Sequence, residues 1–330
     1  MKKRPGIPGR PLFMAETPPT SFRHRAEFAA FKAADALLGH LPWGTLQIMG
    51  RGLGAAFHAL DSRHRRVARE NLRAADLGLS EKEIRVMSRV CFRHYGAMFL
   101  SLLKLRRATP EQLRAWIKIE GLEHFDAAAV EGKGFIQLSG HYGHWEAMAL
   151  LQSLEGRSLA AIGRELDNPL LEPISAAFRT RFGNTVIHKD GGARGTLQAL
   201  RQGRGVGFVL DQDALGAGIF VRCLGRWAST FPTAGAFATR YDLPILPVFS
   251  WPDEKGRIIV RFEAPFKAPR TGDAERDTWV ATQAMTHRIE AQIRKDPRWW
   301  FWMHRRFKTQ PGPGAPDLPP PQWMDGWIKS

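Results

Sequence analysis

Cysteine is scarce in this chain. Its 330 residues include two cysteines, Cys91 and Cys223, and these lie in unrelated segments. Two distant thiols provide neither the disulfide framework of a small secreted domain nor a cysteine-based metal cluster, and they fit a reducing compartment. We therefore interpret both as small core residues rather than reactive thiols.

The chain also lacks a long uninterrupted apolar run. Residues 1–21 are rich in basic residues and proline, so they predict a flexible basic leader rather than a secretion signal. Residues 29–60 are mostly apolar or small, but Lys32, Asp35 and Arg51 interrupt them. No window of about 20 residues there is free of both charge and proline, so a membrane-spanning helix is not expected.

Two helices that meet at Pro42 are the predicted alternative for this segment. One interpretation places them in a membrane interface, with Phe28, Phe31 and Leu38 toward lipid. Asp35 falls on the same side as Phe28 and makes that amphipathicity imperfect. The other interpretation is that the helices cover a protein core, and the sequence leaves both open.

Acidic residues are too few to balance the basic ones. The chain has 48 Lys and Arg against 32 Asp and Glu, a formal net charge of +16. Such an excess favours a polyanionic partner: nucleic acid, an anionic bilayer or an acidic protein. Residues 61–76 form a strongly basic helical pattern that can face phosphate headgroups or simply water.

A second basic segment, residues 296–308, combines three tryptophans with four Arg or Lys residues. Indole rings beside cations suit a membrane interface, or a nucleic-acid surface on which they would stack on bases. Core packing of Trp299 and Trp302, with the neighbouring arginines ion-paired, is the structural alternative.

Helical and strand patterns alternate from residue 111 onward. This alternation predicts an α/β fold with a central, largely parallel sheet flanked by helices. The predicted organisation is a flexible leader at 1–21, a helical membrane-associating region at 22–110, an α/β domain at 111–308 and a Pro/Gly-rich disordered tail at 309–330. Within the α/β domain we predict strands in the 134–138 run and at 159–164, 184–188, 205–211, 245–250 and 257–263, and helices near 111–117, 122–130, 145–154, 169–182, 192–202 and 232–241.

His141 lies in the segment on which the functional hypothesis depends. An apolar strand-like run ends at Ser139-Gly140, and helix-forming residues resume at Trp145. If His141 is in the turn and Glu146 in the first helical turn, the carboxylate can reach one imidazole nitrogen while the other stays open. Such a pair can take a proton from a hydroxyl group. No Gly-x-Ser-x-Gly motif occurs, so the hydroxyl is expected to belong to the substrate.

Simpler interpretations of this segment remain open. A His and an acid at this spacing arise by chance, and a His after a strand can cap the following helix. His144 is a competing base, but it lies two residues from Glu146 and would point away from it on a helix.

Other polar residues also follow predicted strands. Arg164 and Asp211 fall just past strand ends, as His141 does, and ligands of open parallel sheets gather at the carboxyl ends of the strands. The three side chains are therefore expected to share a crevice. Alternatively, Arg164 forms a surface ion pair, and Asp211-Gln-Asp213 is a solvated turn or, less in keeping with its neighbours, a metal ligand. Thr233 begins a predicted helix whose free amides can hold a phosphate.

Six sequence blocks lie in order between residues 60 and 308: Arg69-Glu-Asn-Leu72, Gly140-His-Tyr-Gly-His-Trp-Glu146, Arg164-Glu-Leu-Asp-Asn-Pro169, Gly207-Phe-Val-Leu-Asp-Gln212, Phe231-Pro232 and Trp302-Met-His-Arg-Arg-Phe-Lys308. In these blocks and in their order the chain resembles the bacterial lipid A biosynthesis acyltransferases, which belong to the lysophospholipid acyltransferase-like superfamily with its His-x4-acid motif. Members usually begin with an uninterrupted hydrophobic anchor, which is broken by charges here.

The resemblance implies an O-acyltransferase that takes a fatty acyl chain from acyl carrier protein to a hydroxyl of a lipid A precursor. It places the enzyme on the cytoplasmic face of the inner membrane, either peripheral or anchored by its N-terminus. His141 then matches the general base and Glu146 its partner, Arg164 holds phosphate or carbonyl charge, and Asp211 positions the acceptor. The matching blocks and the predicted helix start add three substrate-binding candidates: Asn168, Gln212 and Thr233.

The expected chemistry needs no metal and no cofactor, because a thioester is already activated. Acyl carrier proteins, phosphorylated glycolipids and the inner leaflet are all anionic, which suits the surplus positive charge. Relatives in the superfamily acylate phosphatidylinositol mannosides or lysophospholipids, so another glycolipid or phospholipid acceptor is an alternative. A basic nucleic-acid-binding protein that uses residues 296–308 is the alternative of a different class; the acyltransferase hypothesis predicts no nucleic-acid partner.

Overall fold

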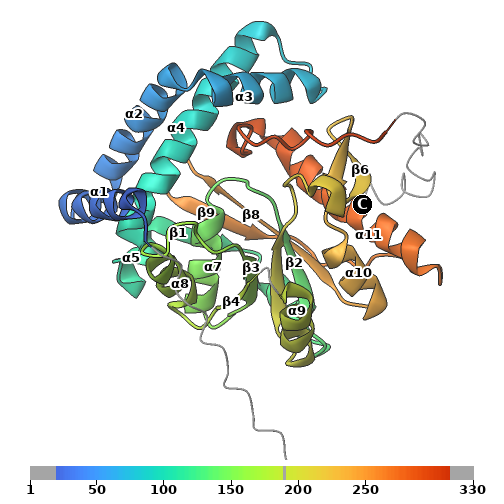
Figure 1. The fold of residues 1–330 in the computed structure, drawn as a ribbon. Helices are drawn as coiled ribbons and strands as arrows, with labels where there is room; N and C mark the ends of the chain where they lie inside the picture. Colours follow the sequence, from blue (N-terminus) through green and yellow to red (C-terminus); the bar gives the residue numbers. More distant parts are fainter. Residues whose placement is uncertain (1–19, 189–190, 313–330) are drawn as a thin grey trace, which may run out of the picture.

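A seven-stranded sheet forms the centre of the computed structural model, which describes residues 20–188 and 191–312 (Figure 1). Its strand order is β1-β9-β8-β2-β5-β3-β4, and every neighbouring pair is parallel except β8 with β9. The predicted α/β class is therefore confirmed. The strands are β1 (Ile117–Glu120), β2 (Phe135–Ser139), β3 (Ala160–Gly163), β4 (Thr185–His188), β5 (Gly205–Val209), β8 (Ile245–Pro252) and β9 (Ile258–Phe262).

Helices cover both faces of the sheet, which is why the central strand β2 is buried along its whole length. Phe135 packs into one core, whereas Ile136 and Leu138 pack into the other. The first core includes α5 (Pro110–Trp116), α6 (Leu122–Ala129), α7 (Trp145–Leu154) and α8 (Glu172–Thr180). The second includes α9 (Gly192–Arg201), α10 (Thr233–Arg240) and α11 (Ala274–Lys295), together with parts of α3 and α4.

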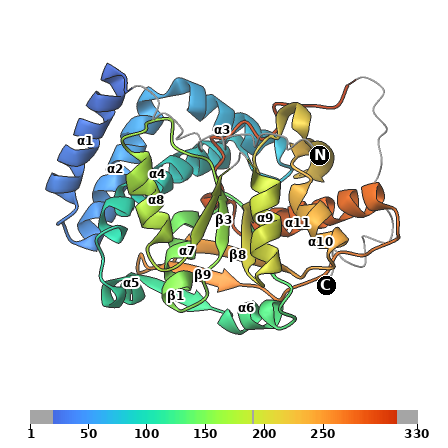
Figure 2. The same cartoon turned by 60° about the horizontal axis from the view of Figure 1, so that its bottom comes forward.

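One α-helix and three strands of the described chain were not predicted from the sequence. They are the short edge strand β1, the helix α11, and the two strands of an antiparallel hairpin, β6 (Ile219–Cys223) and β7 (Arg226–Thr230). In Figures 1 and 2, α10 and α11 lie at the opposite end of the molecule from α1 and α2.

Four helices precede the sheet: α1 (Phe22–Leu38), α2 (Trp43–Leu60), α3 (Ser62–Ala74) and α4 (Glu81–Leu105). The first two meet at Pro42 as predicted. In Figure 1, α2 runs along α4, and small residues allow this close approach. A Cβ atom added at Gly54 would lie 2.1 Å from the Phe92 carbonyl oxygen, so a larger residue there would force the helices apart.

The face of α1 that was a candidate for lipid contact is turned toward the protein instead. Phe28, Phe31 and Leu38 are half-buried. Asp35 on the same side is buried, where it forms ion pairs with Arg106 and Arg107. Burial of the apolar side chains is favourable, and the two arginines offset the desolvation cost of burying Asp35 beside them. This explains the imperfect amphipathicity of the helix.

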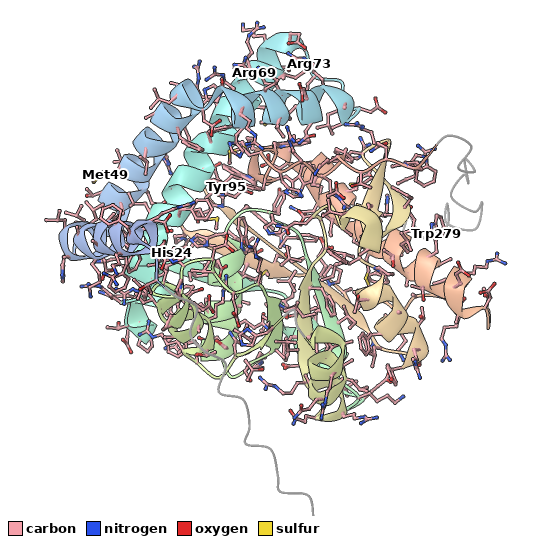
Figure 3. The ribbon with its side chains drawn as sticks, in the orientation of Figure 1. His24, Met49, Arg69, Arg73, Tyr95 and Trp279 are labelled. Atoms are coloured by element: carbon pink, nitrogen blue, oxygen red, sulfur yellow. The ribbon has the colours of Figure 1, made fainter. Side chains whose placement is uncertain are left out.

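The exposed apolar residues gather on α2 instead. Figure 3 shows Met49 on the outer side of this helix. Among residues 20–188 and 191–312, no helix combines the length and hydrophobicity needed to cross a bilayer. The exposed large apolar side chains of α2 are Ile48, Met49, Leu53, Phe57 and Leu60.

The tryptophan-rich segment belongs largely to the core. Trp300, Trp302 and Arg306 are among the largest fully or almost fully buried side chains, and Trp299 is half-buried. The core-packing alternative therefore holds for Trp302 and only in part for Trp299, and Arg306 bonds carbonyl and hydroxyl oxygens rather than an acid. The buried Trp300 and Trp302 are not available to stack on bases. The nucleic-acid alternative thus loses most of the aromatic surface on which it depended.

The predicted leader (1–21) and tail (309–330) lie outside the described residues, apart from residues 20–21 and 309–312. The division of the remaining chain at residue 110 stays a prediction. Residues of α3 and α4 share a core with β2 and β5.

Candidate active site

The topology brings His141 and Asp211 together. The strands β2 and β5 are adjacent and parallel, with Ser139 opposite Val209, so the residues that follow them lie at the same edge of the sheet. The Asp211 carboxylate accepts two hydrogen bonds from His141: the backbone N–H to Oδ2 and the ring Nδ1 to Oδ1, both at 2.7 Å. The carboxylate therefore fixes both the backbone and the ring of His141.

The Asp211 side chain is only 4% exposed, whereas that of His141 is 18% exposed. The indole Nε1 of Trp300 donates a third hydrogen bond to Asp211 Oδ2, at 2.6 Å. Burial by itself would raise the pKa of Asp211. The charge of His141 and the hydrogen bonds from His141 and Trp300 outweigh burial and hold the pKa below its ordinary value. The carboxylate is therefore ionised at neutral pH.

The second imidazole nitrogen faces a weaker partner. The amide Nε2 of Gln212 lies 3.2 Å from His141 Nε2. An ionised Asp211 requires a proton on Nδ1, so Nε2 of the neutral ring carries a lone pair that can accept the amide hydrogen. The site thus holds His141 in the tautomer that a general base needs.

Glu146 is not the partner of His141, and the predicted contact between them is wrong. Asp211 and Gln212 occupy the two ring nitrogens, while Glu146 forms a two-pronged ion pair with Arg179, at 2.7 and 3.2 Å. Burial alone would lower the pKa of Arg179, but the hydrogen bond and charge of Glu146 raise it. The pair joins the first turn of α7 to α8, where it neutralises a half-buried acid.

The competing histidine, His144, has a structural role. It is buried, its ring accepts a hydrogen bond from the Ala147 amide at the start of α7, and its Nε2 lies 2.9 Å from the Ser101 hydroxyl. Burial lowers the pKa of His144 to about 3. The helix cap that was an alternative role for His141 is therefore made by His144.

Aromatic rings surround the imidazole of His141. Trp145 lies edge-on at a centroid distance of 4.8 Å, and Phe301 is 6.3 Å away. The Tyr95 hydroxyl bridges the carbonyl oxygens of His141 (2.9 Å) and Trp299 (2.6 Å). These rings shield one side of the imidazole from water and restrict its motion.

Arg164 does not join the crevice. It follows β3, which lies beyond β5, and its side chain is 75% exposed and ion-paired with Asp167. Asn168 is buried, and its amide donates to the His24 carbonyl (2.9 Å) and the Glu27 carboxylate (3.0 Å). The predicted convergence thus holds for His141 and Asp211 but is wrong for Arg164, and Asn168 ties its loop to α1.

Two further candidates follow the hairpin and β5. Thr233 is the first residue of α10, as the predicted helix start requires, and its role toward substrate stays a prediction. The Asp213 carboxylate accepts hydrogen bonds from the Leu215 and Thr309 amides, each at 2.8 Å. Protein donors therefore satisfy both acids of the Asp-x-Asp sequence.

Arg306 supports the turn that carries Asp211 and Gln212. Its buried guanidinium donates to the carbonyl oxygens of Gln212 and Ser229 (2.6 Å each) and to the Thr230 hydroxyl (2.5 Å). A buried cation held by carbonyl oxygens fixes the backbone next to the His141 ring.

Comparison with known proteins places the chain in a family. The model of the bacterial lipid A biosynthesis acyltransferases matches residues 19–309. The chain belongs to this acyltransferase family. The resemblance drawn from the sequence blocks is thereby confirmed.

Curated relatives match over most of their length. The chain is 26% identical to the lipid A biosynthesis palmitoleoyltransferase of Escherichia coli (strain K12) over 279 residues, which is 82% of this chain and 87% of the relative. It is 24% identical to the lauroyltransferase of the same strain over 283 residues (83% and 89%) and 24% identical to the myristoyltransferase over 294 residues (88% and 90%).

Sequence reasoning missed several parts of this candidate site. Asp211 was identified, but as an acceptor-positioning acid rather than the partner of His141; the adjacency of β2 and β5 was the missing information. Trp300 stood in a noted aromatic segment, and its indole N–H could have been matched to a buried acid. Nothing in the sequence of α4 pointed to Tyr95.

Gly143 provides a direct test of this loop. It has a φ of +60°, and an added Cβ would lie 1.6 Å from the Ser250 carbonyl oxygen. We expect Gly143→Ala to push the loop off β8, displace His141 and lower the acyl-transfer rate at least about tenfold, because small misplacements of catalytic groups are costly. Steady-state kinetics would measure this. Gly156→Ala, which has open space around the added Cβ, is the matched control for a positive φ; equal losses in both variants would contradict the explanation.

Proposed function

We propose that this acyltransferase moves a fatty acyl chain from acyl carrier protein to a hydroxyl of a lipid A precursor, at the cytoplasmic face of the inner membrane. The observation that supports it best is the His141–Asp211 pair at the open edge of the sheet. The Nε2 atom of His141 carries a lone pair, and the Gln212 amide beside it can be displaced by a substrate hydroxyl. Family membership supplies the reaction class.

In the proposed reaction the acceptor hydroxyl takes the place of the Gln212 amide at His141 Nε2. The imidazole accepts the hydroxyl proton while the oxygen forms a bond to the thioester carbonyl carbon. Collapse of the tetrahedral oxyanion breaks the carbon–sulfur bond, and the imidazolium returns its proton to the departing thiolate. The products are an ester and a free thiol, and His141 is again neutral.

Asp211 acts through His141 in this scheme. It holds the Nδ1–H tautomer and stabilises the imidazolium that forms during attack. Glu146 has a different proposed part: together with Arg179 it positions the start of α7 and hence the Trp145 ring that packs on His141. The reaction requires no covalent intermediate on the protein, since the thioester is already activated.

The choice of donor and location rests on charge. The net charge of +16 suits an acidic carrier protein and an anionic leaflet, where each nearby basic side chain contributes about 1 kcal/mol of attraction. Figure 3 shows Arg69 and Arg73 along α3, beside the helix that exposes an apolar side. An exposed apolar helix next to a basic helix is a pattern typical of peripheral membrane attachment.

The membrane contact can be measured with vesicles. We expect Leu53→Ser combined with Leu60→Ser to weaken binding to anionic phospholipid vesicles at least about tenfold, because partial burial of two leucines in lipid is worth more than 1.4 kcal/mol. Vesicle co-sedimentation of the full chain would give the dissociation constant. Val130→Ser is the control, since Val130 at the end of α6 is 80% exposed and Leu60 is 84% exposed. A similar loss in the control, or none in the double variant, would contradict attachment through α2.

The proposed activity is tested by product analysis. The detergent-solubilised protein is offered acyl carrier protein thioesters with three acceptors: a lipid A precursor, a lysophospholipid and a mannosyl phosphoinositide. We expect mass spectrometry to detect acylation of the lipid A precursor above the other two. Faster acylation of another acceptor would replace the proposed acceptor, and transfer from acyl-coenzyme A but not from acyl carrier protein would replace the proposed donor.

A further inference from the structure

A pocket of about 530 Å³ lies beside the loop that carries His141. Its walls come from α2, α4, the β8–β9 turn and the segment before Trp300. This volume is within the range of small-molecule sites. Nothing in the proposed reaction uses the pocket, although Trp299 and His144 in its wall are close in sequence to Trp300 and His141.

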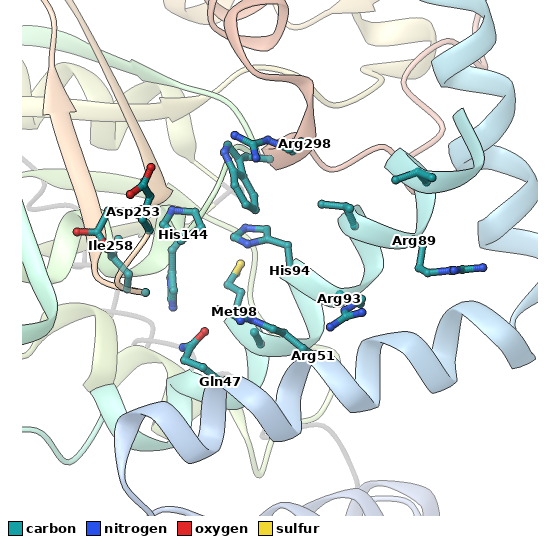
Figure 4. A pocket seen from close by; sticks show the side chains of 17 residues that line it. Gln47, Arg51, Arg89, Arg93, His94, Met98, His144, Asp253, Ile258 and Arg298 are labelled. Atoms are coloured by element: carbon teal, nitrogen blue, oxygen red, sulfur yellow. The ribbon is translucent and has the colours of Figure 1, made fainter. Parts of the chain in front are cut away.

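Arginine dominates the charged lining. Arg51 comes from α2 and Arg89 and Arg93 come from α4, whereas Arg298 lies in the tryptophan-rich segment, directly before Trp299. Figure 4 shows His94 between Arg298 on one side and Arg51 and Arg93 on the other.

Most of this positive charge has no counterion in the protein. Arg298 pairs with Asp296. Within the described part of the chain, the side chains of Arg51, Arg89 and Arg93 form no hydrogen bond or ion pair. Two acids also line the pocket: Asp253, which pairs with Arg257, and the exposed Glu254. Four arginines against two acids leave an excess of positive charge around the pocket, and this excess favours an anionic ligand.

Apart from the arginines and the two acids, the lining is apolar or neutral. Val90 and Met98 of α4 line the pocket together with Ile258 and Trp299. His94 adds no charge of its own at neutral pH, since burial lowers its pKa to about 4. An anion with an apolar portion therefore matches this pocket better than a free ion does. Arginine pairs with phosphate through two parallel hydrogen bonds, so several guanidinium groups favour a phosphate ester over a single carboxylate.

We propose that this arginine pocket binds the phosphate group of a lipid. The inference rests on the proposed function, which calls for a phosphorylated lipid acceptor, and adds a site for its headgroup. The Tyr95 hydroxyl bridges the carbonyl oxygens of Trp299 and His141. The Gly143 amide also donates to the Trp299 carbonyl, at 2.8 Å. A headgroup that contacts Trp299 is therefore connected to the loop of His141 through the hydrogen bonds that the Trp299 carbonyl accepts.

The test is a calorimetric titration of the full chain with dihexanoyl phosphatidic acid below its micellar concentration. We expect Arg51→Gln combined with Arg93→Gln to raise the dissociation constant at least about tenfold, because two charge-assisted contacts are lost. The control, Arg201→Gln combined with Arg276→Gln, removes the same charge from exposed residues of α9 and α11 and should leave binding unchanged. Equal binding by the wild type and the Arg51/Arg93 variant would overturn the proposal.

Two further probes distinguish the source of the phosphate. Inorganic phosphate and dihexanoylglycerol, which has the same acyl chains but no phosphate, should both bind more weakly than the phosphatidic acid. If inorganic phosphate binds as tightly, the pocket is a free-anion site, and if the dihexanoylglycerol binds as tightly, the apolar wall alone is responsible; either result overturns a lipid phosphate site. The titration contains no acyl donor and is repeated with His141→Ala. Arginine-dependent binding without any acyl transfer by the wild type would refute the proposed function alone, whereas transfer with arginine-independent binding would refute the pocket alone.

Discussion

Replacing His141 with alanine is expected to lower the rate of acyl transfer at least about 100-fold, the low end of the loss when a general base is removed. The variant loses the nitrogen that accepts the hydroxyl proton, so the loss should appear in kcat. Substrate binding does not depend on that nitrogen, and KM for the acyl donor should change little. Rates measured with saturating donor and acceptor would check this.

The variant should remain folded. Of the three hydrogen bonds that Asp211 accepts, those from the backbone amide of residue 141 and from Trp300 persist in His141→Ala. If the unfolding temperature of the variant stays close to that of the wild type, the lower rate comes from the chemical step and not from loss of the fold. Wild-type activity in a folded His141→Ala protein would remove His141 as the base.

Asp211→Asn is expected to cost about 100-fold or more in kcat, because it removes the productive tautomer of His141. Oδ2 of Asp211 accepts two N–H groups, from the His141 backbone and Trp300, while Oδ1 accepts one from the ring. An asparagine places its oxygen at the two-donor position and its NH2 group against Nδ1. The ring then carries its proton on Nε2, where the base is needed.

The loss in Asp211→Asn should persist across the neutral pH range. The pKa of Asp211 lies below its ordinary value, so the wild-type carboxylate is ionised throughout that range and no change of pH restores it in the variant. The lowered pKa of Asp211 also makes the free energy of unfolding depend on pH. The ionised carboxylate stabilises the fold at pH values above its unfolded-state pKa, and this contribution falls as the pH drops toward the folded-state pKa.

The variant Glu146→Gln distinguishes the role of Glu146 from that of Asp211. Glu146 pairs with Arg179, and its loss leaves a half-buried guanidinium short of a partner without touching either imidazole nitrogen. We expect a reduction of less than about tenfold in kcat, together with a lower unfolding temperature. A larger kinetic loss in Glu146→Gln than in Asp211→Asn would restore the pairing expected from the spacing of the motif.

Local sequence patterns were sufficient for much of the fold. The break at Ser139-Gly140 and the helix formers from Trp145 placed β2 and α7 correctly, and the alternation of elements indicated a parallel sheet. These features depend on neighbouring residues, which is why they can be predicted. The edge strand β1 is four residues long and continues directly from α5, so it left no pattern of its own.

The partner of His141 could not be found in this way. The order of strands decides which residues meet, and a motif of six residues contains no information about a strand seventy residues later. Glu146 matches the spacing of the His-x4-acid motif, but its carboxylate pairs with Arg179 on α8. Burial of Trp300 and Arg306 was likewise a tertiary outcome: their composition suits a membrane surface, yet each has a specific acceptor in the core.

The most direct measurement is a double-mutant cycle of kcat with His141→Ala, Asp211→Asn and the two combined. If Asp211 acts only by holding His141 as a base, the double variant should be no slower than His141→Ala, within about twofold, since residues that act as a unit are not additive. If the two losses multiply, or if the double variant keeps wild-type activity, the His141–Asp211 pair is not the proton-accepting unit of this acyltransferase.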